Sequence, residues 1–424
     1  MARVYTPQDG YAIMTVLTRL ATGQQSLTAV VNMSDYISAG ELVLGTGKEN
    51  VYNALGILVG RTLVASRAYK EKLALINSLD TGSYTNRLRK ISFYAKDPLP
   101  SGFFNTDLFT NLADGYDGGN NGGASTGSQW EQHQAMPLEM NFAGSTVWQH
   151  CITMYEEQIN AAFRDPQELA AFVAGCVQEH ENDIASTRES FNRMTLLGKM
   201  AATYAYDAAG LSVQVVNLTK AYNDFYNPVT PYTSAELRSS QLDSFLKFMT
   251  ATIKEYSDYL TERSANHHLA LTKTVGGVNY SILRHTPKDR QRLFLFRPLI
   301  RKAEAIVMPE IFNPEYLNMN QYEGVDFWQS NYDDSERPQI KVKTAILDTL
   351  TGEQTASTDI ELDYVVGFLT DVDAVMTDFQ LERSLSTSLN ARKGYRNVWL
   401  SFARNSISDP TENSILFTME DPTP

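Results

Sequence analysis

The sequence predicts an α+β fold, in which helical and strand-forming segments occupy different parts of the chain. Three observations predict it. Strand patterns flank a glycine-rich stretch in the first half of the chain, a long amphipathic segment with a helix start signal begins at Asp165, and the C-terminal part alternates short apolar strands with turns. With 424 residues, the chain is long enough to form more than one compact unit.

The composition is that of a globular protein. Hydrophobic residues make up 43% and charged residues 20% of the chain, and no stretch approaches the roughly 18 uninterrupted apolar residues of a membrane span. The N-terminal residues lack the apolar core of a secretory signal peptide, which indicates a cytoplasmic location without a membrane partner. Cys151 and Cys176 have no metal-binding spacing, so we expect two reduced, half-buried thiols.

The formal charge of −13 argues against a dedicated nucleic-acid binder, but the charge is unevenly distributed. Residues 284–302 carry seven basic residues against Asp289, whereas residues 331–374 carry ten acids against three bases. Opposite patches suit head-to-tail contact between copies of the chain, and two solvated faces explain the pattern equally well. The basic run is also compatible with phosphate contacts that do not read sequence.

An excursion of about 60 residues, 87–150, is predicted to project from the body of the protein. Before it, residues 48–67 follow a helical period and residues 32–47 are interpreted as irregular. The excursion starts with the strand pattern RLRKISFYAKDPLP and ends with the returning strand pattern MPLEMNFAGSTVWQH. Between them lies the glycine-rich run 115–128, which suits the adaptable tip of a two-stranded arm.

Two helices are predicted after the excursion. Asp165, Pro166 and Glu168 form a start signal for a helix that reaches about residue 202. Thr233 and Glu236 form a capping box for a second helix, whose apolar stripe consists of Leu242, Phe245, Met249, Ile253, Tyr256 and Leu260. Strands are then expected in RLFLF, KAEAIVM and IKVKTAIL, with the phenylalanines of RLFLF facing a core.

Four motifs approach catalytic or binding patterns, and none fits its chemistry. Ser125 lies in a GxSxG match that lacks the strand before it and the helix after it. HENDI has Ile184 where a zinc protease needs its second histidine, and the adjacent His267 and His268 point apart on any regular element. GTGKEN lacks the first glycine of a phosphate loop at its required offset. We therefore assign no catalytic, cofactor or metal-binding residue.

Aromatic residues flank the flexible run and are the candidate contacts between subunits. Such side chains on a projecting arm can fill a partner's groove at a small entropy cost, and they can equally pack on the chain's own body. The candidates are Phe103, Phe104, Phe109, Tyr116 and Trp130.

The order of these parts resembles that of tailed-phage major capsid proteins, which have the Hong Kong 97-type capsid fold. The resemblance rests on three features: the two-stranded excursion, the helix that begins with DPQELAAF, and the closing stretch. In the closing stretch DVDAV is expected on a short helix and ENSILF on a strand. The resemblance implies the following division: an N-terminal arm (1–86), an extended loop (87–150), a peripheral domain with a spine helix (151–226), an axial domain (227–357) and returning strands of the peripheral domain (358–424).

The resemblance also implies a function. The chain would be a structural, non-enzymatic protein that assembles into the pentamers and hexamers of an icosahedral head enclosing double-stranded DNA, built in the bacterial host cytoplasm and located in the virion. Its partners would be other copies of itself, a scaffolding protein and a portal, with DNA contacted only non-specifically. Some family members link subunits through a lysine and an asparagine. Lys90 and Lys96 lie near the loop stem, but no matching asparagine or acid is identified. A portal or tail component and a serine hydrolase remain the alternatives.

Overall fold

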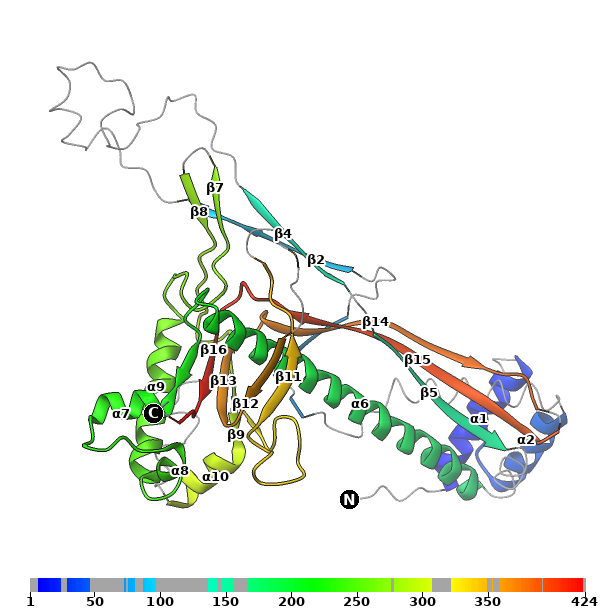
Figure 1. Ribbon diagram of the computed structural model, residues 1–424. Coiled ribbons are helices and arrows are strands. Elements are labelled where there is room, and N and C mark those ends of the chain that lie inside the picture. The colour runs from blue at the N-terminus through cyan, green and yellow to red at the C-terminus, as the bar shows by residue number, and fades with distance from the viewer. Residues whose placement is uncertain are drawn as a thin grey trace, which may run out of the picture. The chain divides into compact units, whose positions relative to one another are not determined.

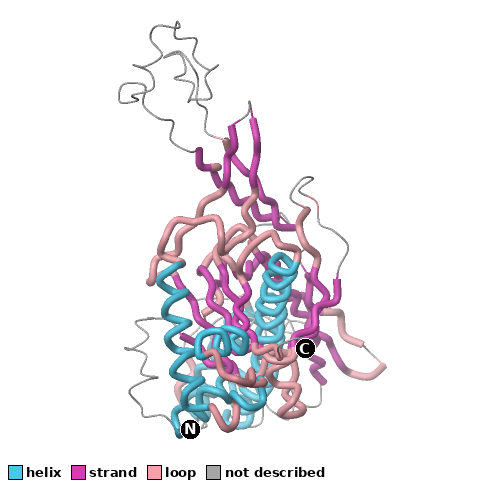
Figure 2. The backbone as a smooth tube through the Cα atoms, turned by 60° about the vertical axis from the view of Figure 1, so that its left-hand side comes forward, coloured by secondary structure: helices cyan, strands magenta, loops and turns pink. Residues whose placement is uncertain are grey.

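The structure is a computed structural model that contains both long helices and paired strands (Figures 1 and 2). The predicted α+β fold class is confirmed. The structure describes residues 7–23, 29–45, 72–73, 75–80, 87–96, 136–143, 146–155, 166–275, 278–306, 322–348, 353, 358–390 and 392–421. The helix expected over residues 48–67, the run 115–128 and all five candidate aromatic residues lie outside these ranges.

The chain divides into two compact units, each made of three separate stretches. Unit 1 comprises Met1–Asn86, Ala143–Thr195 and Met376–Ile407, and unit 2 comprises Arg87–Phe142, Leu196–Val375 and Ser408–Pro424. The division into five parts given above stays a prediction.

Unit 1 contains a four-stranded sheet of order β1-β14-β15-β5. β1 (Asn77–Asp80) is parallel to β14 (Val375–Ser386), and β15 (Tyr395–Ser408) is antiparallel to β5 (Thr146–Tyr155). Two helices, α1 (Pro7–Thr22) and α2 (Met33–Gly45), share a core with this sheet. That core consists of Met14, Leu17, Ala21, Val30, Tyr36, Ala39, Val43, Met154 and Val398.

The helix α2 corrects the interpretation of residues 32–47 as irregular. The side chain of Asn32 accepts a hydrogen bond of 2.8 Å from the backbone N–H of Asp35, as an N-cap does. Tyr36, Ala39 and Val43 then repeat at helical spacing and are all buried. The cap and the spacing were both present in the sequence, but glycines and short polar residues in the same stretch obscured them.

The long helix is confirmed as α6 (Pro166–Ala208), which has 43 residues and contributes to both units. At 1.5 Å per residue it is roughly 64 Å long. It extends six residues beyond the expected end because Ala205 and Tyr206 still lie in a core. It stops at Gly210, whose φ of +69° closes the helix with a hydrogen bond from Leu211 N–H to the Tyr206 carbonyl.

Unit 2 is built on a five-stranded mixed sheet of order β10-β9-β13-β16-β6. Its strands are β6 (Val215–Asn217), β9 (Gln291–Phe296), β10 (Tyr322–Val325), β13 (Val365–Asp371) and β16 (Ser414–Thr418). The strand expected in RLFLF is confirmed, and Phe294 and Phe296 are buried as predicted. Leu293 and Leu295 are buried too, so the sheet is covered on both faces.

Three smaller sheets complete unit 2. β2 (Arg87–Phe93) pairs with β4 (Pro137–Ala143), and β11 (Ile340–Thr344) pairs with β12 (Thr358–Leu362), which confirms the strand expected in IKVKTAIL. β3 (Ala95–Lys96), β8 (Val278–Ser281) and β7 (Thr272–Val275) form the third sheet.

The two ends of the predicted excursion are strands that pair with each other, as expected. The backbone N–H of Tyr94 also donates to the Met136 carbonyl at 3.0 Å, so residues 97–135 leave and return at neighbouring points. One detail of the prediction is wrong. The returning stretch is not a single strand, because β4 pairs with β2 whereas β5 belongs to the sheet of unit 1.

The capping box at Thr233 is confirmed, but the predicted helix is two helices. Thr233 and Glu236 cap the short α8 (Ser234–Leu237), and α9 (Leu242–Tyr259) carries the apolar stripe. The serine pair that follows α8 explains the break: the hydroxyls of Ser239 and Ser240 both bond to backbone carbonyls of α8 and compete with helix continuation. A further helix, α7 (Leu218–Tyr226), precedes α8.

The strand expected in KAEAIVM is wrong, because most of this stretch belongs to α10 (Arg297–Ile306). Pro298 favours the first turn of a helix, and alanine, lysine and glutamate are strong helix formers. The DVDAV stretch forms a tight turn after β13 instead of the expected short helix. The closing ENSILF strand is confirmed as β16.

Two glycines allow a matched test of this fold. A Cβ at Gly198 within α6 meets no heavy atom within 4 Å, whereas a Cβ at Gly367 in β13 would lie 2.5 Å from Leu295 and 2.9 Å from the Phe294 carbonyl. We predict that Gly198→Ala raises the free energy of unfolding by about 0.5–1 kcal/mol. Gly367→Ala should lower it. Urea denaturation of both variants checks this, and equal effects would contradict the description of the two sites.

Candidate functional site

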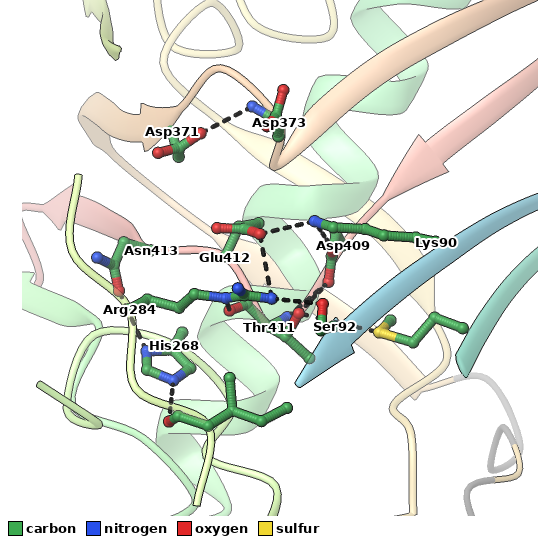
Figure 3. A network of polar contacts seen from close by, with 12 residues as sticks. Lys90, Ser92, His268, Arg284, Asp371, Asp373, Asp409, Thr411, Glu412 and Asn413 are labelled. Carbon is green, nitrogen blue, oxygen red and sulfur yellow. Dashed lines mark hydrogen bonds and ion pairs between the residues drawn. The ribbon is translucent and has the colours of Figure 1, made fainter. Parts of the chain in front are cut away.

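The most extensive polar cluster in the described part of unit 2 surrounds the segment 409–414, which links β15 to β16 (Figure 3). Asp409, Thr411, Glu412, Asn413 and Ser414 are all buried. Buried polar groups must be hydrogen-bonded or paired to be tolerated, so their partners define the site. Those partners come from β2, α6, the chain before β9, and the turn after β13, and we call the whole set the 409–414 network.

Lys90 on β2 provides the central ion pairs. Its Nζ donates to Asp409 Oδ2 and, at 2.6 Å, to Glu412 Oε1. The Asp409 side chain is fully buried and that of Lys90 is 22% exposed. The stem of the excursion is thereby joined to the segment that leads into the main sheet of unit 2.

The other carboxylate oxygen of Asp409 is held by Thr411. Oδ1 accepts from the Thr411 backbone N–H at 2.8 Å and from the Thr411 hydroxyl at 2.7 Å. The sequence Asp-Pro-Thr favours this local turn, because proline fixes one backbone angle and aspartate bonds the backbone two residues on. Both oxygens of the carboxylate are therefore satisfied.

A second buried lysine approaches Asp409 from α6. Lys199 is 1% exposed, and its Nζ donates to the main-chain carbonyl of Asp409 at 2.6 Å. Four residues along α6, the Thr203 hydroxyl lies 3.3 Å from the Ser414 hydroxyl. The C-terminal part of α6 thus contacts both ends of the 409–414 segment.

Arg284 connects the same segment to β2 by a second route. The Nη2 atom of Arg284 lies 3.3 Å from Glu412 Oε1 and donates to Ser92 Oγ at 2.8 Å. Its Nε atom donates to the Thr411 carbonyl at 3.2 Å. Arg284 belongs to the basic run that the sequence analysis singled out, and it is engaged within its own subunit.

The network extends to His268 and to the turn after β13. His268 Nε2 donates to the Ile282 carbonyl at 2.9 Å, and Nδ1 lies 3.1 Å from Asn413 Oδ1. The Asn413 carbonyl accepts from the Asp371 backbone N–H at 3.0 Å. Burial lowers the pKa of His268, with the charges of Arg284 and Lys199 acting in the same direction.

Burial and ion pairing shift the pKa values of the network in opposite directions. Burial lowers the pKa of Lys90, but the charges of Asp409 and Glu412 outweigh it and the pKa is raised. Burial raises the pKa of Asp409, but Lys90 and the Thr411 hydrogen bonds bring it below the usual value. For Glu412 burial prevails over Lys90 and Arg284, so its pKa is raised. Burial also prevails at Lys199 and lowers its pKa to about 8.

The other residues considered in the sequence as possible site residues either have structural roles or lie outside the residues that the structure describes. His267 bonds the Val213 carbonyl at 3.0 Å, so the two histidines face different partners, as expected. Cys151 is a free, half-buried thiol, as predicted. Ser125 and the side chains of Lys96, Cys176 and His180 lie outside the described residues. Among the described residues, no group of His, Cys, Asp or Glu could hold a metal ion.

The uneven charge is partly neutralised inside the chain. Arg290 of the basic run pairs with Asp371 at 3.2 Å and with Asp373, both of the acidic stretch. Arg297 lies 3.4 Å from Asp326. At Arg290 the two patches meet each other within one subunit, whereas Asp326 lies just before the acidic stretch. Among the described helices, none is long and apolar enough to cross a membrane.

Sequence reasoning found Lys90 but missed its partners. The notable signal is the polar run DPTENS between two strands, which must either be exposed or form a buried network. Only the fold brings Lys90, Lys199 and Arg284 to it, since each of them lies more than one hundred positions before the residue of the run that it contacts.

Comparisons with known proteins give matches among solved structures only. No family model matches the sequence, and no curated protein matches it. A structure described as the capsid of Staphylococcus phage Andhra is 8% identical, covers 84% of this chain and 86% of its own, and has a TM-score of 0.48. At this sequence identity the match is a similarity of backbone arrangement.

Two further solved structures match over a comparable share of the chain. One is described as the head fiber and inner core protein of native bacteriophage P68, with 11% identity, 82% of this chain and 83% of the other covered, and a TM-score of 0.48. The other is the capsid of the cyanophage P-SCSP1u, with 10% identity, 84% and 91% covered, and a TM-score of 0.43.

The first prediction for this site concerns stability. Asp409→Ala removes one of the two carboxylates that pair with Lys90 and the buried negative charge nearest Lys199, which keeps only its bond to the main-chain carbonyl. We expect the free energy of unfolding to fall by about 3 kcal/mol. Asp224→Ala is the matched control, because Asp224 forms an exposed pair with Lys220 and its loss should cost under about 1 kcal/mol. Urea denaturation followed by circular dichroism measures both. Equal losses would show that the network contributes no special stability.

The second prediction concerns pH. The pKa of Lys199 falls from 10.5 to about 8 on folding, so between these values the unfolded state binds more protons at this residue. Stability should therefore rise with pH across this window, by at most about 1.4 kcal/mol per pH unit. Lys199→Met should remove this rise. The test is the difference in unfolding free energy between wild type and variant at pH 7.5, 9 and 10. A constant difference would contradict the assignment.

Proposed function

We propose that this protein is a structural major capsid protein of a tailed double-stranded DNA phage. In this proposal copies of the chain assemble into the pentamers and hexamers of an icosahedral head, with a scaffolding protein and a portal as further partners. The shell encloses the genome and touches it without reading sequence. Assembly takes place in the host cytoplasm and the product is the virion.

The observation that carries the proposal is the firm anchoring of the excursion stem. β2 and β4 pair at the point where residues 97–135 leave and return, and Lys90 and Ser92 on β2 bond to the buried 409–414 segment and to Arg284. A stem with buried ion pairs can transmit the load of contacts made farther along the excursion to the body of the subunit. A shell protein whose loop lies on a neighbouring subunit needs a loop stem that is firmly attached to its own subunit.

The excursion sequence supports the same proposal. Residues 97–135 combine glycine-rich stretches with the aromatic residues Phe103, Phe104, Phe109, Tyr116 and Trp130. Aromatic anchors on adaptable backbone suit contacts with neighbours that meet at slightly different angles, as in pentamers and hexamers. Contacts that pass from each copy to the next produce closed rings, from which a shell can be built.

The engagement of Lys90 also bears on subunit linkage. Its ammonium group donates to two carboxylates of the same subunit, and its pKa is raised, which keeps it charged. A charged amine is not a nucleophile. In this proposal Lys90 serves contacts within one subunit and no covalent link between subunits.

The proposal is tested by the form of the assembled protein. Negative-stain electron microscopy of the wild type should show closed shells, whereas rings or tubes would indicate a portal or tail component. Deletion of residues 115–128 should leave the subunit folded, with an unchanged urea midpoint, and should reduce the yield of shells at least tenfold. Shells formed in normal yield by the deletion variant would overturn the role of the excursion, and a wild type that never assembles would overturn the proposed function.

A further inference from the structure

A small apolar protrusion in unit 2 lies outside the 409–414 network and the excursion. It consists of residues 225–232, at the end of α7 and in the loop to α8 (Figure 1), and we call it the α7 knob. Phe225 is 71% exposed, Tyr226 49%, and Val229 fully exposed. A single exposed apolar side chain is common on protein surfaces. Three large ones exposed within a short stretch are unusual, and such clusters mark contact sites.

The knob rests on a cluster of aromatic rings. The rings of Phe225 and Tyr226 lie 5.7 and 6.2 Å from that of Phe248 on α9, measured between centroids. Tyr222, which is buried, lies 4.5 Å from Tyr226 and 5.4 Å from Phe248. The exposed rings are therefore supported from below by packed aromatic side chains.

The backbone of the knob is held in one shape. Asn227 adopts the left-handed conformation and its N–H bonds the Asn223 carbonyl at 2.8 Å. The Asn223 side chain donates to the Tyr232 carbonyl and accepts from the Tyr232 N–H, each at 2.9 Å. Pro228 and Pro231 fix two further backbone angles. Little conformational entropy is left to lose when such a loop binds, which favours its use as a contact.

The charge around the knob indicates what it contacts. Residues 225–233 contain no charged side chain, and the nearest charges on α7 and α9 are neutralised in pairs: Lys220 with Asp224 at 2.7 Å, and Lys247 with Asp243 at 3.0 Å. The chain as a whole carries a charge of −13. Two copies therefore carry a net mutual repulsion. An uncharged apolar knob is a place where they can meet without bringing like charges together.

We propose that the α7 knob is a contact surface for a second copy of this chain and that Val229 and Phe225 insert into an apolar surface of that copy. A protrusion cannot be complementary to itself, so the receiving surface is a different part of the second copy. Such a contact is heterologous and closes into a ring when the rotation permits. The inference rests on the proposed function insofar as both require self-assembly, and it names a surface that the excursion does not supply.

The test compares two substitutions of the same kind. Val229→Asp places a charge on the knob, and Val213→Asp places the same charge on another exposed valine of unit 2, whose side chain is 63% exposed. We expect Val229→Asp to raise the protein concentration needed for assembly at least tenfold, while Val213→Asp leaves it within a factor of two of wild type. Light scattering and sedimentation velocity of the full chain measure this.

Folding of the variants is checked by urea denaturation, and both midpoints should match that of wild type because the side chains face solvent. If aspartate at position 229 lowers the midpoint, Phe225→Ser provides the same test with an uncharged side chain. Wild type and Val229→Asp assembling at equal concentrations would overturn the knob contact and leave the proposed function intact. Loss of binding to a separate head protein with unchanged self-assembly would also overturn it. A wild type that stays monomeric at every concentration would overturn the proposed function itself.

Discussion

The pairing of buried charges around Asp409 is the constraint on which the rest of unit 2 depends. A fully buried carboxylate is costly unless each oxygen has a partner, and here Lys90 and Thr411 provide them. Meeting this requirement brings together β2, α6 and the segment before β16, which lie far apart in the sequence. The network thereby fixes where the stem of the excursion joins the main sheet.

The same constraint separates two kinds of contact in this protein. In the 409–414 network, charged side chains make buried, specific contacts, as Lys90, Lys199 and Arg284 do. The surfaces proposed to meet other copies are apolar and aromatic, both in the excursion and at the α7 knob. This division suits a chain of charge −13. Copies with the same net charge repel each other, and burial of apolar area stabilises their contact without placing further like charges close together.

Much of the fold could be predicted from local signals in the sequence. The start of α6, the capping box at Thr233 and the strand β16 follow from short patterns whose physics is local. The errors arose where local signals compete. Ser239 and Ser240 interrupt what reads as one helix, and in α2 the short polar residues obscured a correct apolar spacing. The pairing of β5 with β15 could not be read at all, because it joins strands more than two hundred residues apart.

The candidate site was less accessible to prediction than the fold. Lys90 attracted attention only through a resemblance, and the run DPTENS gives no indication of which cations it binds. Ion pairs between distant residues depend on the closed fold, and no spacing rule encodes them. The knob is different, because its prolines, asparagines and aromatic residues are contiguous in the sequence. The structure adds the exposure of Val229 and the aromatic rings beneath Phe225 and Tyr226.

The position of β16 has a consequence for biosynthesis. It is the last of the described strands in chain order, yet it lies inside the main sheet of unit 2, between β13 and β6. While the ribosome is still adding the residues before β16, β13 and β6 lack the strand that joins them. A nascent chain therefore cannot complete this sheet before β16 has been translated, and a chain that lacks β16 leaves β6 without its partner strand.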